Sequence, residues 1–305
     1  MRLFILLLLL VGCTKNNPYS EDCNIALELG ISFPPVADGQ QRDFTAPLLQ
    51  ELGVKRIRIA DRWSFREPTP GVFNWGPLDE RIAWAEAQGL AILLTIQSEG
   101  PDWACSSVSN TNSCIYNNNA DFQNYVEQLL QRYPNRIAKI QFGNEWMSDF
   151  WYIGTGAQFA AANNIVYDAV QQYSPDTKVV LGGFTSISLR IMAACDGLIE
   201  VLQDDDGNTY NRQYLDDNCG TDPTVQQARA KIDVVLNTAR YDEVDMHLYD
   251  DPENWNAMHQ VLVSKTSKPV IVTEFGGPNV ILEPQDEAYQ AQRLKDYIRA
   301  INDLP

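Results

Sequence analysis

Two glutamates in this chain each come directly after a short apolar run. Glu145 ends the stretch 140–145, which reads Ile-Gln-Phe-Gly-Asn-Glu, and Glu274 follows the stretch 269–273, which reads Pro-Val-Ile-Val-Thr. Each run has the length and the β-branched or aromatic content of a buried strand. One carboxylate after a strand is common on protein surfaces, whereas two at the ends of strands in one sheet can meet across a cleft. Such a pair can divide the roles of nucleophile and general acid between its members.

The elements that must position these glutamates alternate between short apolar strands and amphipathic helices, which is typical of an α/β protein with a parallel sheet. Strands are predicted at residues 27–33, 56–60, 91–96, 139–142, 178–183, 243–248 and 269–273. Helices fall between them, and the segment 185–241 is long enough to add a further helix and a loop over the active face. Glu145 and Glu274 then follow the fourth and seventh strands, and in barrels of such units the chemistry lies where strands end.

Seven βα units are found in this pattern, and the last helix is predicted at 286–302. The pattern predicts an α/β fold of the TIM (β/α)8 barrel type that lacks the eighth βα unit, with a catalytic domain over residues 27–305. Either one strand escapes recognition or the chain stops short of its natural end, and we favour truncation because residues 303–305 look like the approach to another strand. An open edge in the barrel is expected to reduce stability or activity.

The first residues resemble a bacterial export signal. A basic start, Met1-Arg2, precedes an apolar run over residues 3–11 that is too short to span a bilayer. The run ends in Leu-Val-Gly-Cys, which resembles a lipobox and implies that Cys13 is lipidated once a signal peptide of residues 1–12 is removed, with 13–26 as a polar tether. The alternative is an ordinary signal peptide that contains a cysteine. We therefore expect an exported lipoprotein, anchored to a bacterial membrane through its lipid alone and facing the periplasm or the cell exterior.

Charge and cysteine spacing fit export. The formal net charge of −17 argues against nucleic acid as a partner, because no basic cluster is present to neutralise phosphates. Cys105 and Cys114 bracket a Ser/Asn-rich loop, and Cys195 and Cys219 bracket an Asp-rich one, so all four are disulfide candidates in an oxidising compartment. Cys23 would stay unpaired. The spacing of cysteines and histidines matches no metal site, and no cofactor is expected.

The sequences around the glutamates resemble the glycoside hydrolases of clan A, which are barrels with catalytic glutamates after strands four and seven. The pair Asn144-Glu145 is similar to the clan's Asn-Glu signature, which implies that Glu145 is the acid/base and that Asn144 binds a sugar 2-hydroxyl. Glu274 is similar to the clan's nucleophile. The stretch 61–75, with Asp-Arg-Trp, Glu-Pro, Pro-Gly and Phe-Asn-Trp in turn, looks like families thirty-nine, five and forty-two. The resemblance covers roughly residues 27–300.

Three further residues are carried over from family five. Arg58 falls where that family has an arginine near the nucleophile, and His247 and Tyr249 are similar to its His-x-Tyr, whose tyrosine contacts the nucleophile. A cation and a phenol beside Glu274 would favour its charged form. His247 could instead be a buried core histidine. The third strand departs from the pattern, because it ends at Gln97 where family five often has a histidine, so that substrate contact is not expected here.

Five tryptophans follow predicted strand ends on the loop face and are candidates for sugar contacts, since flat rings with a polar edge suit the faces of sugars. They are Trp63, Trp103, Trp146, Trp151 and Trp255. The alternative for each is that it packs in the core, as we expect for Trp75 and Trp84.

These observations predict a retaining glycoside hydrolase that cleaves O-glycosidic bonds, of β configuration, in poly- or oligosaccharides by double displacement. The alternative is a non-catalytic carbohydrate-binding lipoprotein on a glycosidase scaffold, although a binding protein has no need of both carboxylates. A metal-dependent hydrolase is disfavoured, because the two histidines do not have ligand spacing. The expected partner is a carbohydrate substrate, and a monomer is expected.

Overall fold

The computed structural model describes residues 6–11, 27–110, 113–204, 207–249, 252–276 and 286–305 of the chain. Seven parallel strands form the predicted barrel, in the order in which they occur along the chain. These are β2 (Leu27–Ser32), β3 (Arg56–Asp61), β4 (Ala91–Ile96), β7 (Lys139–Phe142), β8 (Lys178–Phe184), β11 (Glu243–Tyr249) and β12 (Val270–Gly276). The predicted α/β barrel and its seven βα strands are confirmed, with boundaries close to those expected.

The eighth position of the barrel is filled in a way that the sequence pattern did not predict. β1 (Leu6–Val11) lies between β12 and β2 and pairs antiparallel with both, so that Leu9 is opposite Leu29 on one side and Val272 on the other. The eighth βα unit is absent from the described residues, as predicted, and in the unprocessed chain the backbone of β1 pairs with both edge strands instead, so an open edge is expected only after removal of residues 1–12. β1 is also the apolar part of the predicted signal peptide, which stays a prediction. Cys13, Cys23 and the remainder of the predicted tether lie outside the described residues.

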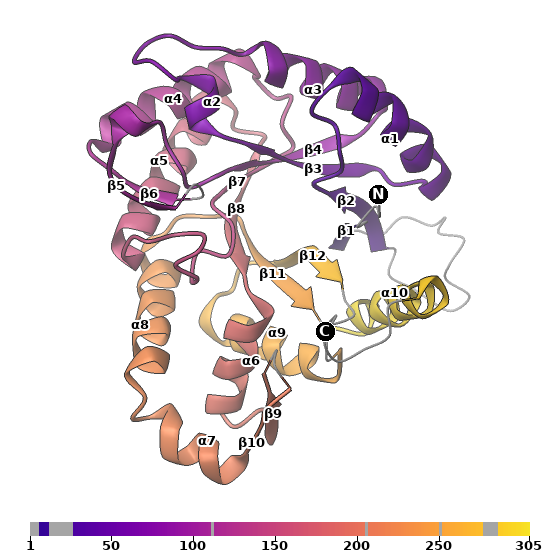
Figure 1. Cartoon of the computed structure of the whole chain (residues 1–305), viewed down its shortest axis with the longest axis vertical. Coiled ribbons are helices and arrows are strands. Elements are labelled where there is room, and N and C mark those ends of the chain that lie inside the picture. The colour runs from indigo at the N-terminus through magenta and orange to yellow at the C-terminus, as the bar shows by residue number, and fades with distance from the viewer. Residues whose placement is uncertain (1–5, 12–26, 111–112, 205–206, 250–251, 277–285) are drawn as a thin grey trace.

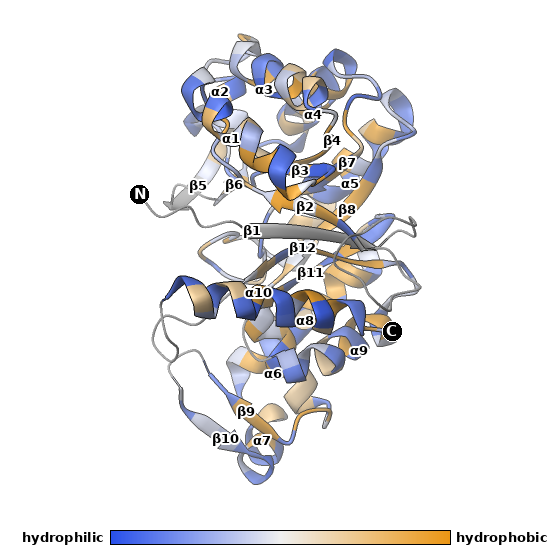
Figure 2. Cartoon of the chain, turned by 90° about the vertical axis from the view of Figure 1, so that its right-hand side faces the viewer, coloured by the Kyte–Doolittle hydropathy of each residue, from blue (hydrophilic) through white to orange (hydrophobic). Residues whose placement is uncertain are grey.

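A layer of helices surrounds the barrel (Figure 1), and the visible outer faces of the helices are largely hydrophilic while the strands are largely hydrophobic (Figure 2). The long helices are α1 (Gly39–Leu52), α3 (Gly76–Ala87), α4 (Asn119–Arg132), α5 (Gly156–Tyr173), α8 (Pro223–Thr238), α9 (Trp255–Lys265) and α10 (Glu287–Asn302). Local sequence explains where they begin. Thr155 and Gln158 form a reciprocal capping box at α5, and Asp222 caps α8 just before Pro223. None of the helices in the described part of the chain is long and apolar enough to cross a membrane.

Two segments extend the basic barrel plan, and each carries a disulfide. After β4 comes a turn, η1 (Asp102–Ala104), and then a hairpin of β5 (Cys105–Asn110) and β6 (Ser113–Tyr116), whose first strand is joined to its second by Cys105–Cys114. After β8 come α6 (Ser186–Cys195), a hairpin of β9 (Val201–Gln203) and β10 (Thr209–Asn211), and α7 (Arg212–Cys219), with Cys195 bonded to Cys219. Both predicted disulfides and the predicted extra helix are confirmed. Short elements at other strand ends are α2 (Trp63–Arg66) and η2 (Pro252–Asn254).

Side chains inside the barrel lie in layers, because alternate residues of each strand point inward. The ion pairs Arg56–Glu28 and Lys139–Glu243 come from residues near the beginnings of the strands. Leu93, Val180 and Ile271 form an apolar cluster of their own above them. The next inward residues of the same strands are polar and buried, including Arg58, Thr95, Gln141 and Asp245. The polar layer therefore lies directly beneath the ends of the strands, where the two glutamates are found.

Candidate active site

The two glutamates reach the same end of the barrel from different kinds of backbone. Glu274 lies within β12, whereas Glu145 comes three residues after the end of β7. Glu145 has a left-handed backbone, with φ of 41°, and follows Gly143, with φ of 72°. A side chain at Gly143 would meet the Phe159 ring at 2.8 Å, so only glycine fits there. A non-glycine residue held in the left-handed region is strained, and such strain often marks a functional position.

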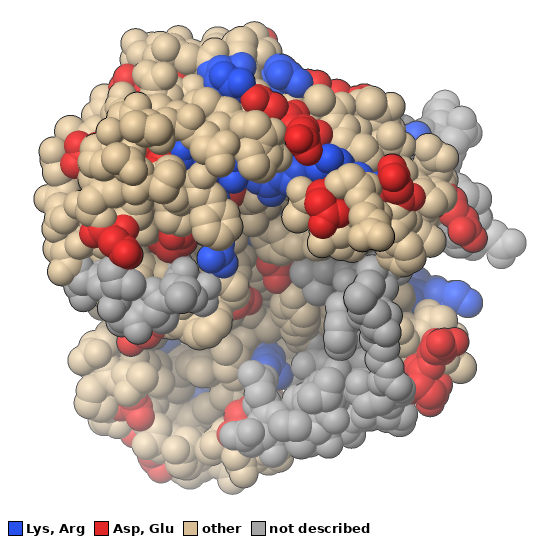
Figure 3. Space-filling view, turned by 45° about the horizontal axis from the view of Figure 1, so that its top comes forward, with Lys and Arg blue, Asp and Glu red and all other residues tan. Residues whose placement is uncertain are grey.

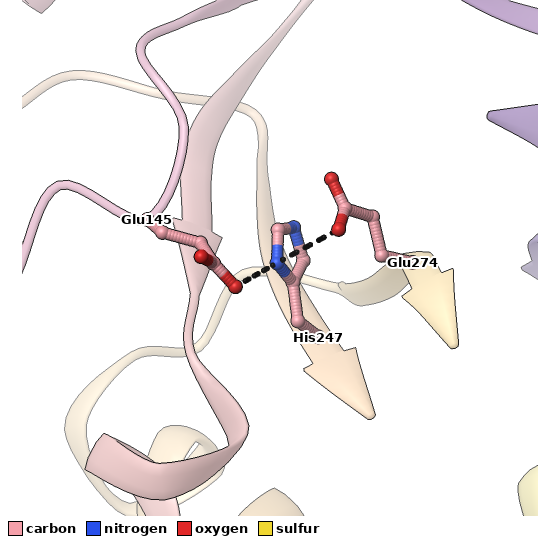
Figure 4. Close-up of side chains that lie close together, drawn as sticks. All are labelled: Glu145, His247 and Glu274. Carbon is pink, nitrogen blue, oxygen red and sulfur yellow. Dashed lines mark hydrogen bonds and ion pairs between the residues drawn. The ribbon is translucent and has the colours of Figure 1, made fainter. Parts of the chain in front are cut away.

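Glu145 and Glu274 converge on one imidazole, that of His247 (Figure 4). Nδ1 of His247 lies 2.9 Å from Oε1 of Glu145 and 3.5 Å from Oε2 of Glu274. One oxygen of each carboxylate and one nitrogen of the imidazole all lie within 4.8 Å of one another. The register of the sheet brings His247 and Glu274 together, because His247 on β11 pairs directly with Glu274 on β12. An irregularity in the strand pairing lies next to this pair. The face of the molecule in Figure 3 is hollowed between its upper and lower parts, and acidic atoms are visible inside the hollow.

Glu274 is surrounded by groups that favour its ionised form. The guanidinium of Arg58 forms a buried ion pair with Oε1, and the hydroxyl of Tyr249 donates to Oε2 at 2.8 Å. Burial alone would raise the pKa of Glu274, but the charges of His247 and Arg58 and the hydrogen bond from Tyr249 outweigh it and lower the pKa. The side chain is only 8% exposed. Glu274 is therefore an ionised carboxylate in a nearly dry site.

Glu145 has fewer and weaker partners. The indole of Trp151 donates from Nε1 to Oε2 at 2.9 Å, and His247 contacts the other oxygen. The side chain of Glu145 is 21% exposed, more than twice the exposed fraction of Glu274. Glu145 is therefore more open to solvent than Glu274 and has no guanidinium beside it.

His247 is buried between acidic groups. Burial alone would lower its pKa, but the charges of Glu274 and Asp245 and hydrogen bonds with Asp245 and Glu145 together raise it to about 10. At neutral pH both ring nitrogens then carry protons and donate. His247 thus acts here as a buried cation between the two glutamates.

Three acidic or imidazole groups this close could in principle hold a metal ion, and Glu145, His247 and Glu274 are the set within the described residues that meets that geometry. Their partners argue against it. The Arg58 guanidinium already neutralises Glu274, and a protonated imidazole has no lone pair for a metal. The cluster is better understood as a network of ion pairs and hydrogen bonds.

Comparison with known proteins agrees with this geometry. The sequence matches the family described as "Cellulase (glycosyl hydrolase family 5)" over residues 36–303. The chain belongs to glycosyl hydrolase family 5. Of the families that the motifs resemble, this match selects family five.

Curated relatives align with parts of the chain. A β-galactosidase of Thermus thermophilus is 40% identical over 78 residues, which make up 25% of this chain and 12% of that protein. Endo-1,4-β-xylanase A of Fusarium oxysporum f. sp. lycopersici is 22% identical over 167 residues, which make up 54% of this chain and 43% of that protein. The aligned part therefore spans less than half the length of either relative.

Solved structures share the fold of this family 5 chain. The crystal structure of β-glycosidase BGL167 superposes with a TM-score of 0.59 at 16% identity, covering 86% of this chain and 72% of that one. A family 39 glycoside hydrolase from Bacteroides cellulosilyticus WH2 superposes with a TM-score of 0.59 at 14% identity, covering 91% and 57%. At these identities the similarity shows a common fold.

Other residues carried over from the resemblance also lie near Glu274. Arg58 and Tyr249 contact Glu274, and Asn144 is buried beside Arg58, whose Nη2 donates to its Oδ1 at 2.9 Å. Gln97, at the end of β4, is nearly buried. The predicted contacts of these residues with a sugar stay predictions.

The tryptophans were largely misassigned. Trp63 and Trp146 are 0% exposed and Trp255 is 1% exposed, so none of their rings offers a face to a sugar. Trp63 packs among other aromatic rings, Trp146 stacks on Phe159, and Trp255 packs against Tyr297. We therefore withdraw these three as substrate contacts. Trp103 is partly buried and donates to the carbonyl of Glu67, while Trp151 lies at the site and donates to Glu145.

Phe33 was missed by the sequence analysis. It follows β2, has a left-handed backbone with φ of 49°, and the residue is 37% exposed. The guanidinium of Arg58 lies 4.4 Å from the ring centroid, so the ring covers the cation that faces Glu274. The position of Phe33 at the end of a predicted strand was a signal for it, although its ring was not distinguishable from a core phenylalanine.

Proposed function

We propose that this chain is a retaining glycoside hydrolase that acts on β-glycosidic bonds in poly- or oligosaccharides. The observation that carries the proposal is the separation of Glu145 and Glu274, whose nearest oxygens lie within 4.8 Å. Retaining enzymes hold their two carboxyl groups about 5–5.5 Å apart, whereas inverting enzymes need about 6.5–9.5 Å to admit a water molecule. The spacing here supports the retaining arrangement.

The unlike surroundings of the two carboxyls support a division of roles. Ionised Glu274 attacks the anomeric carbon and forms a glycosyl ester, while the bond to the leaving oxygen breaks and Glu145 gives that oxygen its proton. Glu145, now ionised, takes a proton from water while the water oxygen attacks the anomeric carbon. The ester bond to Glu274 breaks, which releases the sugar and regenerates the Glu274 carboxylate. His247 and Trp151 remain hydrogen-bonded near Glu145 through both steps.

The names of similar proteins support the β configuration. They include a β-galactosidase, an endo-1,4-β-xylanase and a β-glycosidase. The particular sugar differs among these proteins, so we propose a class of bond rather than one substrate.

The proposal is tested by a hydrolysis screen on the protein with aryl β-glycosides, aryl α-glycosides and β-linked polysaccharides. We expect turnover of at least one β-glycoside, with Glu274→Ala lowering kcat by roughly four to six orders of magnitude. Glu145→Ala should lower kcat by about 10²–10⁴-fold on poor leaving groups, and azide should restore turnover on good ones. Glu127→Ala, on the outer helix α4, is the matched control and should keep wild-type activity.

Product stereochemistry decides the mechanism. NMR during early turnover should show the β-anomer before mutarotation. If the α-anomer forms first, the enzyme is inverting and the assigned roles are wrong.

The second candidate, a carbohydrate-binding lipoprotein without turnover, is favoured by the exposed Phe33 ring at the site. It would be supported if the folded protein bound oligosaccharides, hydrolysed none of the panel, and kept its affinity in Glu145→Gln.

We also propose that the chain is exported and lipidated at Cys13, on the strength of the apolar run 3–11 and the Leu-Val-Gly-Cys motif. Metabolic labelling with an alkyne fatty acid in a bacterial host should mark the wild type and not Cys13→Ser. Equal labelling of both would contradict the proposal.

A further inference from the structure

A buried carboxylate, Asp245 on β11, lies beneath the two glutamates and is hydrogen-bonded to residues that lead to both of them. It is fully buried. Its Oδ2 accepts hydrogen bonds from Nε2 of Gln141 at 2.6 Å and from Oγ1 of Thr273 at 2.5 Å, and faces Nε2 of His247 at 3.2 Å. Its Oδ1 accepts from the backbone N–H of Thr273 at 2.9 Å. All four neighbours are donors, so both oxygens must act as acceptors.

This arrangement favours the ionised carboxylate, because all four neighbouring groups can then donate to its two oxygens. Burial favours the neutral acid, but the charge of His247, its hydrogen bond, the Arg58 guanidinium and Thr273 outweigh burial and lower the pKa of Asp245. A buried anion is therefore maintained below the active site.

Two chains of contacts lead upward from Asp245. Through His247 it reaches Glu145, since the opposite ring nitrogen contacts that carboxylate at 2.9 Å. Through Gln141 it reaches Arg58, because Oε1 of Gln141 accepts from Nη2 of Arg58 at 2.6 Å. Arg58 in turn forms the ion pair with Glu274.

The orientation of Gln141 ties these two chains together. Its Oε1 also accepts from Oγ1 of Thr95 at 3.0 Å, and Thr95 accepts from Nε of Arg58 at 3.0 Å. The amide of Gln141 consequently has to present its NH2 to Asp245.

We propose that Asp245 is a positioning residue that holds both glutamates in their working geometry, by orienting His247 toward Glu145 and, through Gln141, Arg58 toward Glu274. The placement is independent of what the enzyme acts on, whereas its kinetic consequence rests on the proposed glycoside hydrolase function.

Asp245→Asn is the informative change, because it keeps the shape and removes the charge. The amide NH2 of the variant must take the place of one carboxylate oxygen. In one orientation it faces Nε2 of Gln141 and Oγ1 of Thr273, and in the other it faces the backbone N–H of Thr273. His247 also loses one of the anions that raise its pKa, and retains Glu274 and Glu145 as acidic neighbours. We therefore expect its proton to be held less tightly.

NMR of ring-labelled histidine tests the placement without any substrate. The chain has 2 histidines, so His259 serves as an internal control and His259→Gln assigns the signals. In the wild type, His247 should stay protonated well above neutral pH. In Asp245→Asn its midpoint should fall by about one to three pH units, the effect of one nearby opposite charge, while His259 is unchanged. An unaltered midpoint for His247 overturns the proposal.

Kinetics test the consequence for catalysis. Asp245→Asn should lower kcat by roughly 100-fold with KM within about threefold, and should move the alkaline limb of the pH profile to lower pH. Asp61→Asn is the matched control, because Asp61 is as deeply buried but pairs with Arg66 and Arg81. It should keep kcat within about threefold and keep the shape of the pH profile. Equal losses in the two variants would mean that Asp245 matters for stability alone.

A milder variant keeps the proposal testable if Asp245→Asn does not fold. Thr273→Val removes one donor to Asp245 and leaves its charge, so kcat should fall about 3–10-fold, the value of one hydrogen bond, with both pH limbs in place. Wild-type kcat in that variant overturns the proposal. If the wild type hydrolyses nothing, the proposed function fails, and the NMR titration still decides whether Asp245 holds His247.

Discussion

Glu274, the proposed nucleophile, and Glu145, the proposed acid/base, have different surroundings, although both carboxylates contact the same imidazole. Glu274 lies in a strand, is almost fully buried, and faces a guanidinium and a phenol. Glu145 lies beyond the end of a strand, in a left-handed backbone conformation, and is held by an indole and an imidazole. One side has a fixed charge environment and the other is partly open to solvent.

The difference corresponds to what each proposed role requires. A nucleophile must begin ionised, so a permanent cation beside it is favourable, provided that the geometry is good enough to offset desolvation. An acid/base changes its charge twice in each catalytic cycle, and Glu145 shares the His247 imidazolium with Glu274 but lacks a second cation such as Arg58. The other partner of Glu145 is a neutral donor, the indole of Trp151.

Arg58→Met should have the largest effect, because it breaks the nucleophile side of the comparison. Loss of one partner from a buried ion pair costs about 3–5 kcal/mol, so kcat/KM should fall roughly a hundredfold to several thousandfold. Removal of the Arg58 charge also raises the pKa of Glu274, which must be ionised to attack, so the acidic limb of the pH profile should move to higher pH. Steady-state kinetics on an aryl glycoside from pH 4 to 9 measure both effects.

The control for that change lies on the same strand. Arg56 also forms an ion pair, with Glu28, but in the layer near the beginnings of the strands. Arg56→Met should keep the pH profile of the wild type. If both variants lost the same activity with unshifted profiles, Arg58 would contribute to the barrel rather than to the ionisation of Glu274.

Tyr249→Phe removes the neutral part of the same clamp and should have a smaller effect. A hydrogen bond to a charged group is worth about 1.5–3 kcal/mol, so kcat/KM should fall roughly 10- to 100-fold. The hydroxyl of Tyr241, which donates to Thr266 away from the site, provides the matched control in Tyr241→Phe. Comparable losses in the two variants would show that the phenol of Tyr249 has no particular value to the nucleophile.

Much of this arrangement could be predicted because strand ends and strand alternation are visible in the sequence. The positions of Glu145 and Glu274 follow from the strands that precede them, and both disulfides follow from cysteines that bracket loops. Asp245 could also have been found, since it shares the inward face of its strand with His247. The signal was present and was not used.

Other features had no local signal. Beyond a strand end the alternation of inward and outward residues is lost, so Trp63, Trp146 and Trp255 could not be told from rim residues although they are buried. The apolar run of β1 has the composition of a signal peptide, and its pairing with β2 and β12 depends on contacts with residues more than a dozen positions away. The left-handed conformations of Phe33 and Glu145 are likewise consequences of tertiary packing.

Trp151→Phe tests the proposed acid/base side and should lower kcat by about 3–10-fold, because Glu145 loses a donor whose hydrogen bond strengthens by roughly 1 kcal/mol when the carboxyl gives up its proton. The loss should be greater for substrates with poor leaving groups, which need the proton from Glu145 most, and nearly absent for good ones. Trp103→Phe removes an indole donor that contacts a backbone carbonyl and should show no such dependence. A uniform loss across leaving groups would mean that Trp151 does not assist proton transfer.

The last prediction is about stability rather than catalysis, and it concerns the imidazole that the two sides share. The pKa of His247 is raised from 6.5 to about 10, so its contribution to stability is fully present below about pH 6.5 and is lost as the pH rises toward 10. The pKa values of Glu274 and Asp245 are lowered, so their contributions are present above their ordinary values and are lost as the pH falls through the lowered ones. The calorimetric Tm should therefore decline between about pH 6.5 and 10, and His247→Gln should reduce this decline. The control is His259→Gln, which should leave the decline unchanged, because burial lowers the pKa of His259 instead of raising it. The same alkaline slope in His247→Gln as in the wild type would contradict a buried imidazolium between the two glutamates, and with it the contrast between a fixed and an adjustable side of the site.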